Sequence, residues 1–137
     1  MEQQYTILIV DDDCLELAVM NDALTSAGFK VLMADGGETG YPRAIFAQPD
    51  LILLDVVMPG FDGYQTCELL RWNVRTKDIP VIFRTCLDSA TNGLEGYQAG
   101  GDRYISKQCD PEELVSEIKS LLTSTPRDHI RHCYQLL

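Results

Sequence analysis

Residues 51–55 read Leu51-Ile52-Leu53-Leu54-Asp55, a short apolar run that ends in a carboxylate. A second run of the same kind occupies residues 7–13 and reads Ile7-Leu8-Ile9-Val10-Asp11-Asp12-Asp13. Neither run alternates polar with apolar residues, which is typical of strands buried on both faces of a parallel sheet. Ligands of such sheets bind at the carboxyl ends of the strands. The two runs therefore predict that carboxylates gather at one edge of a parallel sheet.

Strand-like and helix-like segments alternate along the rest of the chain. After the first run, apolar residues recur at helical spacing and stop near Gly28, which suits a helix end. Further strands are predicted at 30–33, 51–54, 80–84 and 102–105, and further helices at 38–47, 64–71, 89–98 and from Asp110 onward. Pro42 fits its helix only in the first turn. The pattern predicts an α/β fold, a doubly wound five-stranded parallel sheet of flavodoxin-like order 2-1-3-4-5 with helices on both faces.

Composition limits the class of protein. The chain has 137 residues, 45% of them hydrophobic, which is enough for one domain with its own core. The net charge of −10 argues against a surface for nucleic acid or membrane, because both are polyanions that attract basic patches. No apolar stretch has the length of a signal peptide or a membrane span. We therefore expect a cytoplasmic protein that binds neither nucleic acid nor membrane.

Five cysteines are scattered through the chain, at positions 14, 67, 86, 109 and 133. They form no Cys-x-x-Cys pair and show no spacing typical of a metal site. An odd, scattered set fits buried thiols in a reducing compartment better than it fits a disulfide framework. We expect Cys86 in particular to be packed and unreactive.

Polar side chains stand at the ends of four predicted strands. The acidic triplet follows the first strand, Asp55 ends the third, Thr85 ends the fourth and Lys107 follows the fifth. In the order 2-1-3-4-5 these strands are neighbours, so the four groups meet at one edge of the sheet. Carboxylate oxygens at a solvent edge suit Mg²⁺. A carboxylate nucleophile, a hydroxyl and an ammonium beside such a cation predict a site for phosphoryl transfer.

Four stretches carry a resemblance to a known family, and they are residues 7–12, 53–63, 79–85 and 99–107. The most specific is Asp55-x-x-Met58-Pro59-Gly60-x-Asp62-Gly63. In this order the stretches resemble the receiver domain of response regulators in two-component signalling, the CheY-like family. The resemblance extends over about residues 5–122. It implies a signalling domain that catalyses its own phosphorylation and dephosphorylation, and not a conventional enzyme.

The resemblance implies an acceptor and a metal site. Asp55 is the residue that takes a phosphoryl group from a histidine kinase or a phosphotransfer protein in a Mg²⁺-dependent reaction. Asp12 is the main metal carboxylate, supported by Asp11 and by Asp55 itself. The backbone carbonyl of Val57 is implied as a further ligand.

The resemblance also implies a switch. Thr85 and Lys107 hold the phosphoryl group, and Tyr104 turns inward as Thr85 moves. The added anionic oxygens then bias an existing two-state equilibrium. The surface that changes is formed by the helix expected at 89–98, the strand at 102–105 and the last helix.

Three residues depart from the family pattern. Gln108 follows Lys107 where the family usually has proline, so we expect a trans peptide there, because a cis bond before another residue costs roughly 3 kcal/mol. Arg84 replaces an apolar strand residue, and we expect it to reach an exposed edge or to mark an altered strand. Cys86 replaces a smaller residue. These departures favour an alternative function, a receiver-like protein-interaction module that works without phosphorylation.

Two further functions are weighed and disfavoured. A hydrolase of the haloacid-dehalogenase kind needs Asp-x-Asp-x-Thr after the first strand, and the threonine is missing here. Flavin binding needs small polar residues that cradle a phosphate in the same loop, and the acidic triplet stands there instead. Residues 1–123 are expected to form the receiver domain and 124–137 a tail or a linker to an output domain outside this chain. The sequence leaves open a receiver homodimer.

Overall fold

The computed structural model describes residues 4–86 and 99–123. The expected helix at 89–98 and the segment 124–137 lie outside the described residues. Within the described ranges the chain forms β1 (Thr6–Val10), α1 (Cys14–Ser26), β2 (Lys30–Ala34), α2 (Gly37–Ala47), β3 (Leu51–Asp55), α3 (Gly63–Trp72), β4 (Val81–Thr85), β5 (Arg103–Ser106) and α5 (Pro111–Thr123).

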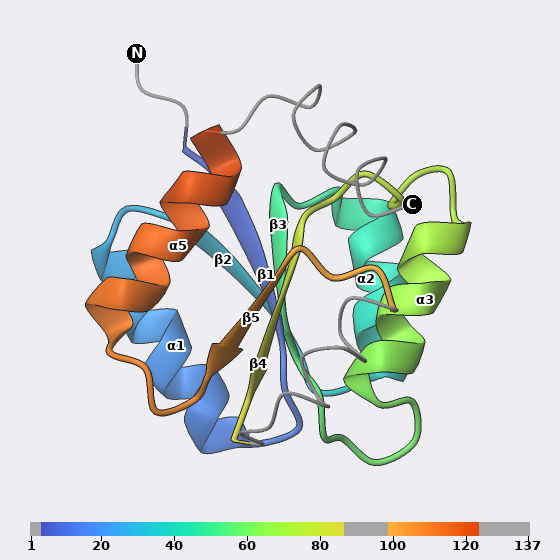
Figure 1. The fold of residues 1–137 in the computed structure, drawn as a ribbon, viewed down its shortest axis with the longest axis horizontal. Helices are drawn as coiled ribbons and strands as arrows, with labels where there is room; N and C mark the ends of the chain where they lie inside the picture. Colours follow the sequence, from blue (N-terminus) through green and yellow to red (C-terminus); the bar gives the residue numbers. More distant parts are fainter. Residues whose placement is uncertain (1–3, 87–98, 124–137) are drawn as a thin grey trace.

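The strands form one parallel sheet in the order β2-β1-β3-β4-β5, which confirms the expected topology. Helices α1 and α5 cover one face of this sheet, and α2 and α3 cover the other (Figure 1). In this order β3 lies between β1 and β4, so the ends of three strands adjoin at its carboxyl end. Among the described residues, no helix is long and apolar enough to cross a membrane.

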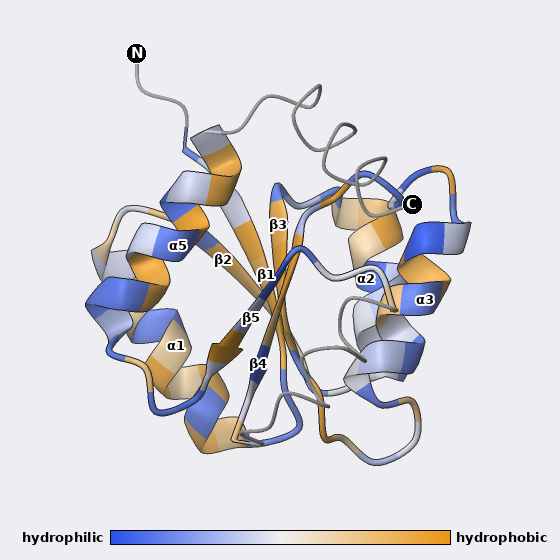
Figure 2. Ribbon diagram, viewed as in Figure 1, coloured by the Kyte–Doolittle hydropathy of each residue, from blue (hydrophilic) through white to orange (hydrophobic). Residues whose placement is uncertain are grey.

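Burial explains why the strand sequences are continuously apolar. All five residues of β3 and of β4 are buried, and side chains of β3 alternate between two cores. Leu53 packs with the side chains of α1 and α5, whereas Leu54 packs with those of α2 and α3. Figure 2 shows the same arrangement: β1 and β3 are hydrophobic and lie between helices of mixed character. Burying one leucine fully contributes about 1.5–3 kcal/mol, so this alternation dominates the stability of the sheet.

Capping residues set the helix ends close to the predicted positions. Gly28 adopts a φ of 96° just after α1, and the next amide donates to Leu24, which confirms the predicted stop. Helix α3 begins at Gly63, one residue earlier than expected, because Asp62 and Gln65 form a capping box. Pro42 lies inside α2 beyond its first turn, contrary to the expectation, because the helix begins at Gly37.

The cysteines are less buried than expected. Of the four in the described ranges, all unpaired, only Cys67 is buried, and burial raises the pKa of its thiol to about 11. Cys86 is exposed and Cys109 is partly exposed. The prediction that Cys86 is packed is therefore wrong, because β4 ends one residue earlier and the chain leaves the core there.

Arg71, near the end of α3, ties several segments together. Its guanidinium donates to the carbonyl oxygens of Gly100 (2.8 Å) and Ile79 (2.7 Å) and pairs with Asp102 at 3.0 Å. The same Asp102 carboxylate accepts a hydrogen bond from the amide of Val81, at the start of β4. Arg71 thus fixes the segment before β5 against α3 and the start of β4.

We expect Arg71→Met to lower the free energy of unfolding by about 3 kcal/mol, because it leaves two part-buried carbonyls without this donor and Asp102 without its counterion. Arg75→Met is the matched control: Arg75 is exposed, and its loss should cost no more than about 0.5 kcal/mol. Urea unfolding of both variants measures the difference. Equal losses of unfolding free energy in the two variants would contradict the role of Arg71 in tying these segments together.

Candidate functional site

Asp55 is positioned by the close packing of α3 against the end of β3. Its side chain is buried, and the chain turns back so that the amide of Gly63 donates to Val56 at 2.8 Å. A Cβ atom at position 63 would collide with the backbone oxygen of Asp55 and with Val56. Only glycine therefore allows this approach, which explains Gly63 in the sequence.

Three carboxylates gather at this edge of the sheet. One oxygen each from Asp11, Asp12 and Asp55 lies within 4.8 Å of the others, with Asp11 and Asp55 buried and Asp12 exposed. Asp11 is fixed by its neighbours: its amide donates to Ala34 (3.1 Å), and its Oδ1 accepts from the amide of Asp13 (2.9 Å). Two buried carboxylates and one exposed carboxylate leave the site open to solvent on one side. Such a set of oxygen ligands fits a hard cation that keeps several waters, as Mg²⁺ does.

Lys107 brings a positive charge to the two buried carboxylates. Its Nζ lies 3.0 Å from Asp11 Oδ2 and 3.4 Å from Asp55 Oδ2. The backbone amide of Lys107 donates to the carbonyl of Thr85 at 2.8 Å, which fixes the lysine against the end of β4. The structure therefore brings Asp11, Asp12, Asp55 and Lys107 together, as the strand order predicts.

The charges perturb one another. Burial, followed by repulsion from Asp11, raises the pKa of Asp55 to about 6, although Lys107 opposes this. Burial alone would lower the pKa of Lys107, but its hydrogen bonds and ion pairs with Asp11 and Asp55 outweigh burial and raise it. At neutral pH Asp55 is thus an ionised carboxylate of increased basicity beside a fixed ammonium.

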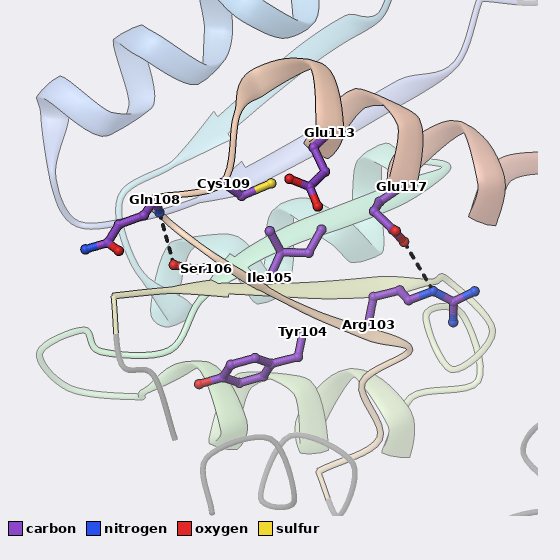
Figure 3. Close-up of a pocket in the computed structure, with 8 residues that line it drawn as sticks. All are labelled: Arg103, Tyr104, Ile105, Ser106, Gln108, Cys109, Glu113 and Glu117. Carbon is purple, nitrogen blue, oxygen red and sulfur yellow. Dashed lines mark hydrogen bonds and ion pairs between the residues drawn. The ribbon is translucent and has the colours of Figure 1, made fainter. Parts of the chain in front are cut away.

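The turn after β5 explains how Gln108 is accommodated. The amide of Gln108 donates to the Oγ of Ser106 at 3.1 Å (Figure 3), and the amide of Cys109 donates to the Ser106 carbonyl, also at 3.1 Å. Proline has no amide hydrogen and would lose the first of these bonds. The peptide between Lys107 and Gln108 is trans, as expected.

Thr85 and Tyr104 lie on neighbouring strands near the site. Thr85 is fully buried at the end of β4, and Tyr104 of β5 is the register partner of Phe83. The Tyr104 ring is partly buried, with its centroid 6.4 Å from that of Phe83. A groove of about 620 Å³ lies between β5 and α5, and the Tyr104 ring points away from it (Figure 3). The switch role of Thr85 and Tyr104 stays a prediction. The role of the Val57 carbonyl as a metal ligand also stays a prediction; Val57 is exposed and follows shortly after β3.

Arg84 differs from both expectations. It neither reaches an exposed edge nor interrupts β4: it is buried inside the strand and pairs with Glu16 of α1 at 2.8 Å. Glu16 was not among the residues selected from the sequence. A signal was present, because a charge inside a buried strand requires a partner of opposite charge, and Glu16 stands in the first turn of the helix that comes after the acidic triplet.

Comparison with known proteins gives a consistent result. The profile described as response regulator receiver domain matches residues 7–119. The chain is 39% identical to RpaA of Synechocystis, a DNA-binding dual master transcriptional regulator, over 88% of this chain and 50% of RpaA. It is 37% identical to the protein PilH of Pseudomonas aeruginosa, over 85% of this chain and 96% of PilH. The BeF3-activated receiver domain of Klebsiella pneumoniae RstA is similar with a TM-score of 0.81 at 28% identity, covering 87% and 99% of the two chains.

The relatives differ in length. The chain spans about half the length of the transcriptional regulators that it matches, RpaA among them. It spans nearly the whole of PilH. The similarity thus concerns one module, which occurs within larger proteins and in a short protein.

In the absence of Mg²⁺, we expect Asp55→Asn to stabilise the protein at neutral pH. The raised pKa of Asp55 means that the protonated carboxyl contributes stability that is fully present below the ordinary value of 3.8 and is lost as pH rises through about 6. The variant removes this loss and should gain about 2 kcal/mol near pH 7.5 and about half of that near pH 5.

Urea unfolding with a chelator present measures this gain at both pH values. Asp22→Asn is the control: it removes one exposed carboxylate of α1 and should change stability by no more than about 0.5 kcal/mol. A gain for Asp55→Asn that does not depend on pH would show that burial and Asp11 do not raise its pKa.

Proposed function

Because the chain belongs to the response regulator receiver domain family of two-component signalling, we propose that Asp55 is the residue that accepts the phosphoryl group. The observation that carries this proposal is the buried Asp55 carboxylate at the end of β3, close to Asp11 and to the ammonium of Lys107. The proposed donor is a histidine kinase or a histidine phosphotransfer protein, in keeping with the family.

The transfer is a displacement at phosphorus. An oxygen of the Asp55 carboxylate forms a bond to the phosphorus of a phosphohistidine, while the bond from phosphorus to nitrogen breaks and its electron pair returns to the imidazole. Asp55 is ionised at neutral pH, so no base is needed to activate it. Lys107 lies within 3.4 Å of the nucleophile and neutralises charge on the transferred oxygens.

The residues that would hold Mg²⁺ are Asp11, Asp12 and Asp55, with the backbone carbonyl of Val57 as a further proposed ligand. The donor set supports this: it consists of oxygen atoms alone, and one of its members faces solvent. When bound, the cation supplies charge that stabilises the oxygens of the transferring group. Asp12, the exposed member, is the proposed main ligand.

Thr85 and Tyr104 are the proposed switch residues. Thr85 ends β4, and its carbonyl already accepts the amide of Lys107, so a shift of one is transmitted to the other. A hydrogen bond from the Thr85 hydroxyl to the new phosphoryl oxygens would bias the equilibrium between two arrangements of the surface around β5. Part of that surface, the segment 87–98, lies outside the described residues.

The proposal assigns residues 1–123 to the receiver domain and residues 124–137 to a tail or a linker. Output then runs through protein contact, a receiver homodimer, or a domain outside this chain. The DNA-binding regulator RpaA is about twice as long as the region of similarity, whereas PilH is not. The proposed location is the cytoplasm, which suits the exposed thiols of Cys14 and Cys86.

Labelling tests the acceptor. Incubation with Mg²⁺ and acetyl phosphate should add one phosphoryl group to the wild-type protein in an intact mass measurement, and Asp55→Asn should remove this gain completely. Asp22→Asn, the exposed control, should be labelled like the wild type. Labelling of Asp55→Asn at the wild-type level would overturn the assignment, and no labelling of the wild type would favour the phosphorylation-independent interaction module.

Lys107→Ala separates the lysine from the metal site. The variant should still bind Mg²⁺ at least as tightly as the wild type, because loss of the ammonium leaves Asp11 and Asp55 with less neutralising charge. Acyl phosphate formation should fall at least about tenfold, because one charge on the phosphoryl oxygens is no longer stabilised. Isothermal titration with Mg²⁺ and timed mass measurement give the two values. A loss of metal affinity would show that Lys107 supports the ligands instead.

A further inference from the structure

Arg84 is the one charged residue of the buried strand β4. It lies in β4, a central strand whose five residues are all buried, and its side chain is only 8% exposed. Its register neighbours are Asp55 on β3 and Ile105 on β5. Alternation along β4 places Arg84 on the side opposite Phe83, with the core of α1 and α5. A buried guanidinium therefore lies one strand from the proposed phosphoryl acceptor.

The partner of Arg84 is Glu16, on the first turn of α1. The two side chains approach to 2.8 Å, and Glu16 is itself one third exposed. An apolar pair would hold these elements together at least as stably, since desolvation offsets much of the attraction between buried charges.

The ion pair connects the two halves of the site. Glu16 comes soon after the acidic triplet that ends at Asp13, the N-terminal cap of α1. Arg84 immediately precedes Thr85, whose carbonyl accepts the Lys107 amide. Glu16 is therefore close in sequence to the carboxylates of the site, and Arg84 is next to Thr85, which is proposed to hold the phosphoryl group.

We propose that the Glu16–Arg84 ion pair is a positioning element that holds the end of β4, and with it Thr85, in its arrangement without a phosphoryl group. The inference rests on the proposed function of Asp55 and Thr85. Movement of Thr85 toward Asp55 displaces the adjacent Arg84 and strains an ion pair anchored on α1. An interaction made in one arrangement stabilises that arrangement, so the pair raises the cost of activation.

Removal of the pair should therefore favour the activated arrangement. The test variant is the double substitution Glu16→Gln with Arg84→Met, which removes both charges and leaves neither unpaired. The control is Asp22→Asn with Arg75→Met, which removes two exposed charges outside the surface proposed to switch and causes the same change in charge. Arg84→Lys keeps the charge at position 84 and tests rescue.

Beryllofluoride stands in for the phosphoryl group, and its dissociation constant at saturating Mg²⁺ is measured by fluorine NMR. The Glu16/Arg84 double variant should bind it about fivefold more tightly than the wild type. The control pair and Arg84→Lys should remain within about twofold of the wild type. Urea unfolding of each protein accompanies the titration, because a purely structural role would change stability and leave the affinity unchanged.

Each outcome decides the inference. Equal or weaker binding by the double variant overturns it, as does an equal gain by the control pair. If the double variant does not fold, Glu16→Asp, which shortens the carboxylate arm and keeps both charges, should still bind at least about threefold more tightly, and an affinity within about twofold of the wild type overturns the inference. A wild-type protein that binds no beryllofluoride and takes no label contradicts the proposed function, and the inference with it.

Discussion

Two carboxylates buried side by side must be neutralised, and this constraint organises the rest of the molecule. Asp11 and Asp55 stand at the ends of neighbouring strands and repel each other, and burial followed by this repulsion raises the pKa of Asp55. Lys107 spans both and offsets part of the repulsion. The remaining negative charge is what the proposed Mg²⁺ would neutralise. Structure and proposed chemistry thus depend on one electrostatic imbalance.

The fold keeps the two buried carboxylates and the lysine together by holding three strand ends close to one another. The order β2-β1-β3-β4-β5 makes β1 and β4 the neighbours of β3. Gly63 lets α3 pack directly on the backbone of Asp55, and the amide of Lys107 is bonded to the end of β4. Arg71, on the same helix α3, fixes the segment before β5. The ion pair of Glu16 with Arg84 adds a tether that the fold itself does not require.

Features set by the strand ends could be predicted from the sequence, whereas contacts between distant side chains could not. Apolar runs ending in Asp55 and in the acidic triplet implied the sheet order and the cluster, because parallel strands place their carboxyl ends at one edge. A charge inside the apolar β4 run signalled that Arg84 needs a partner of opposite charge, but Glu16 lies far away in the sequence, so no local pattern identified it as that partner. The position of Pro42 within α2 and the exposure of Cys86 likewise depend on where elements begin and end in space.

The central claim is that Asp55, the neighbouring carboxylates and Lys107 form one site for a phosphoryl group and its cation. A crystal structure of the protein with Mg²⁺ and beryllofluoride tests it most directly. The account predicts beryllium bonded to an Asp55 oxygen, the cation among Asp11, Asp12 and Asp55, and Lys107 Nζ in contact with a fluorine. A cation bound elsewhere, or beryllofluoride absent from Asp55 at saturating concentration, would contradict the account.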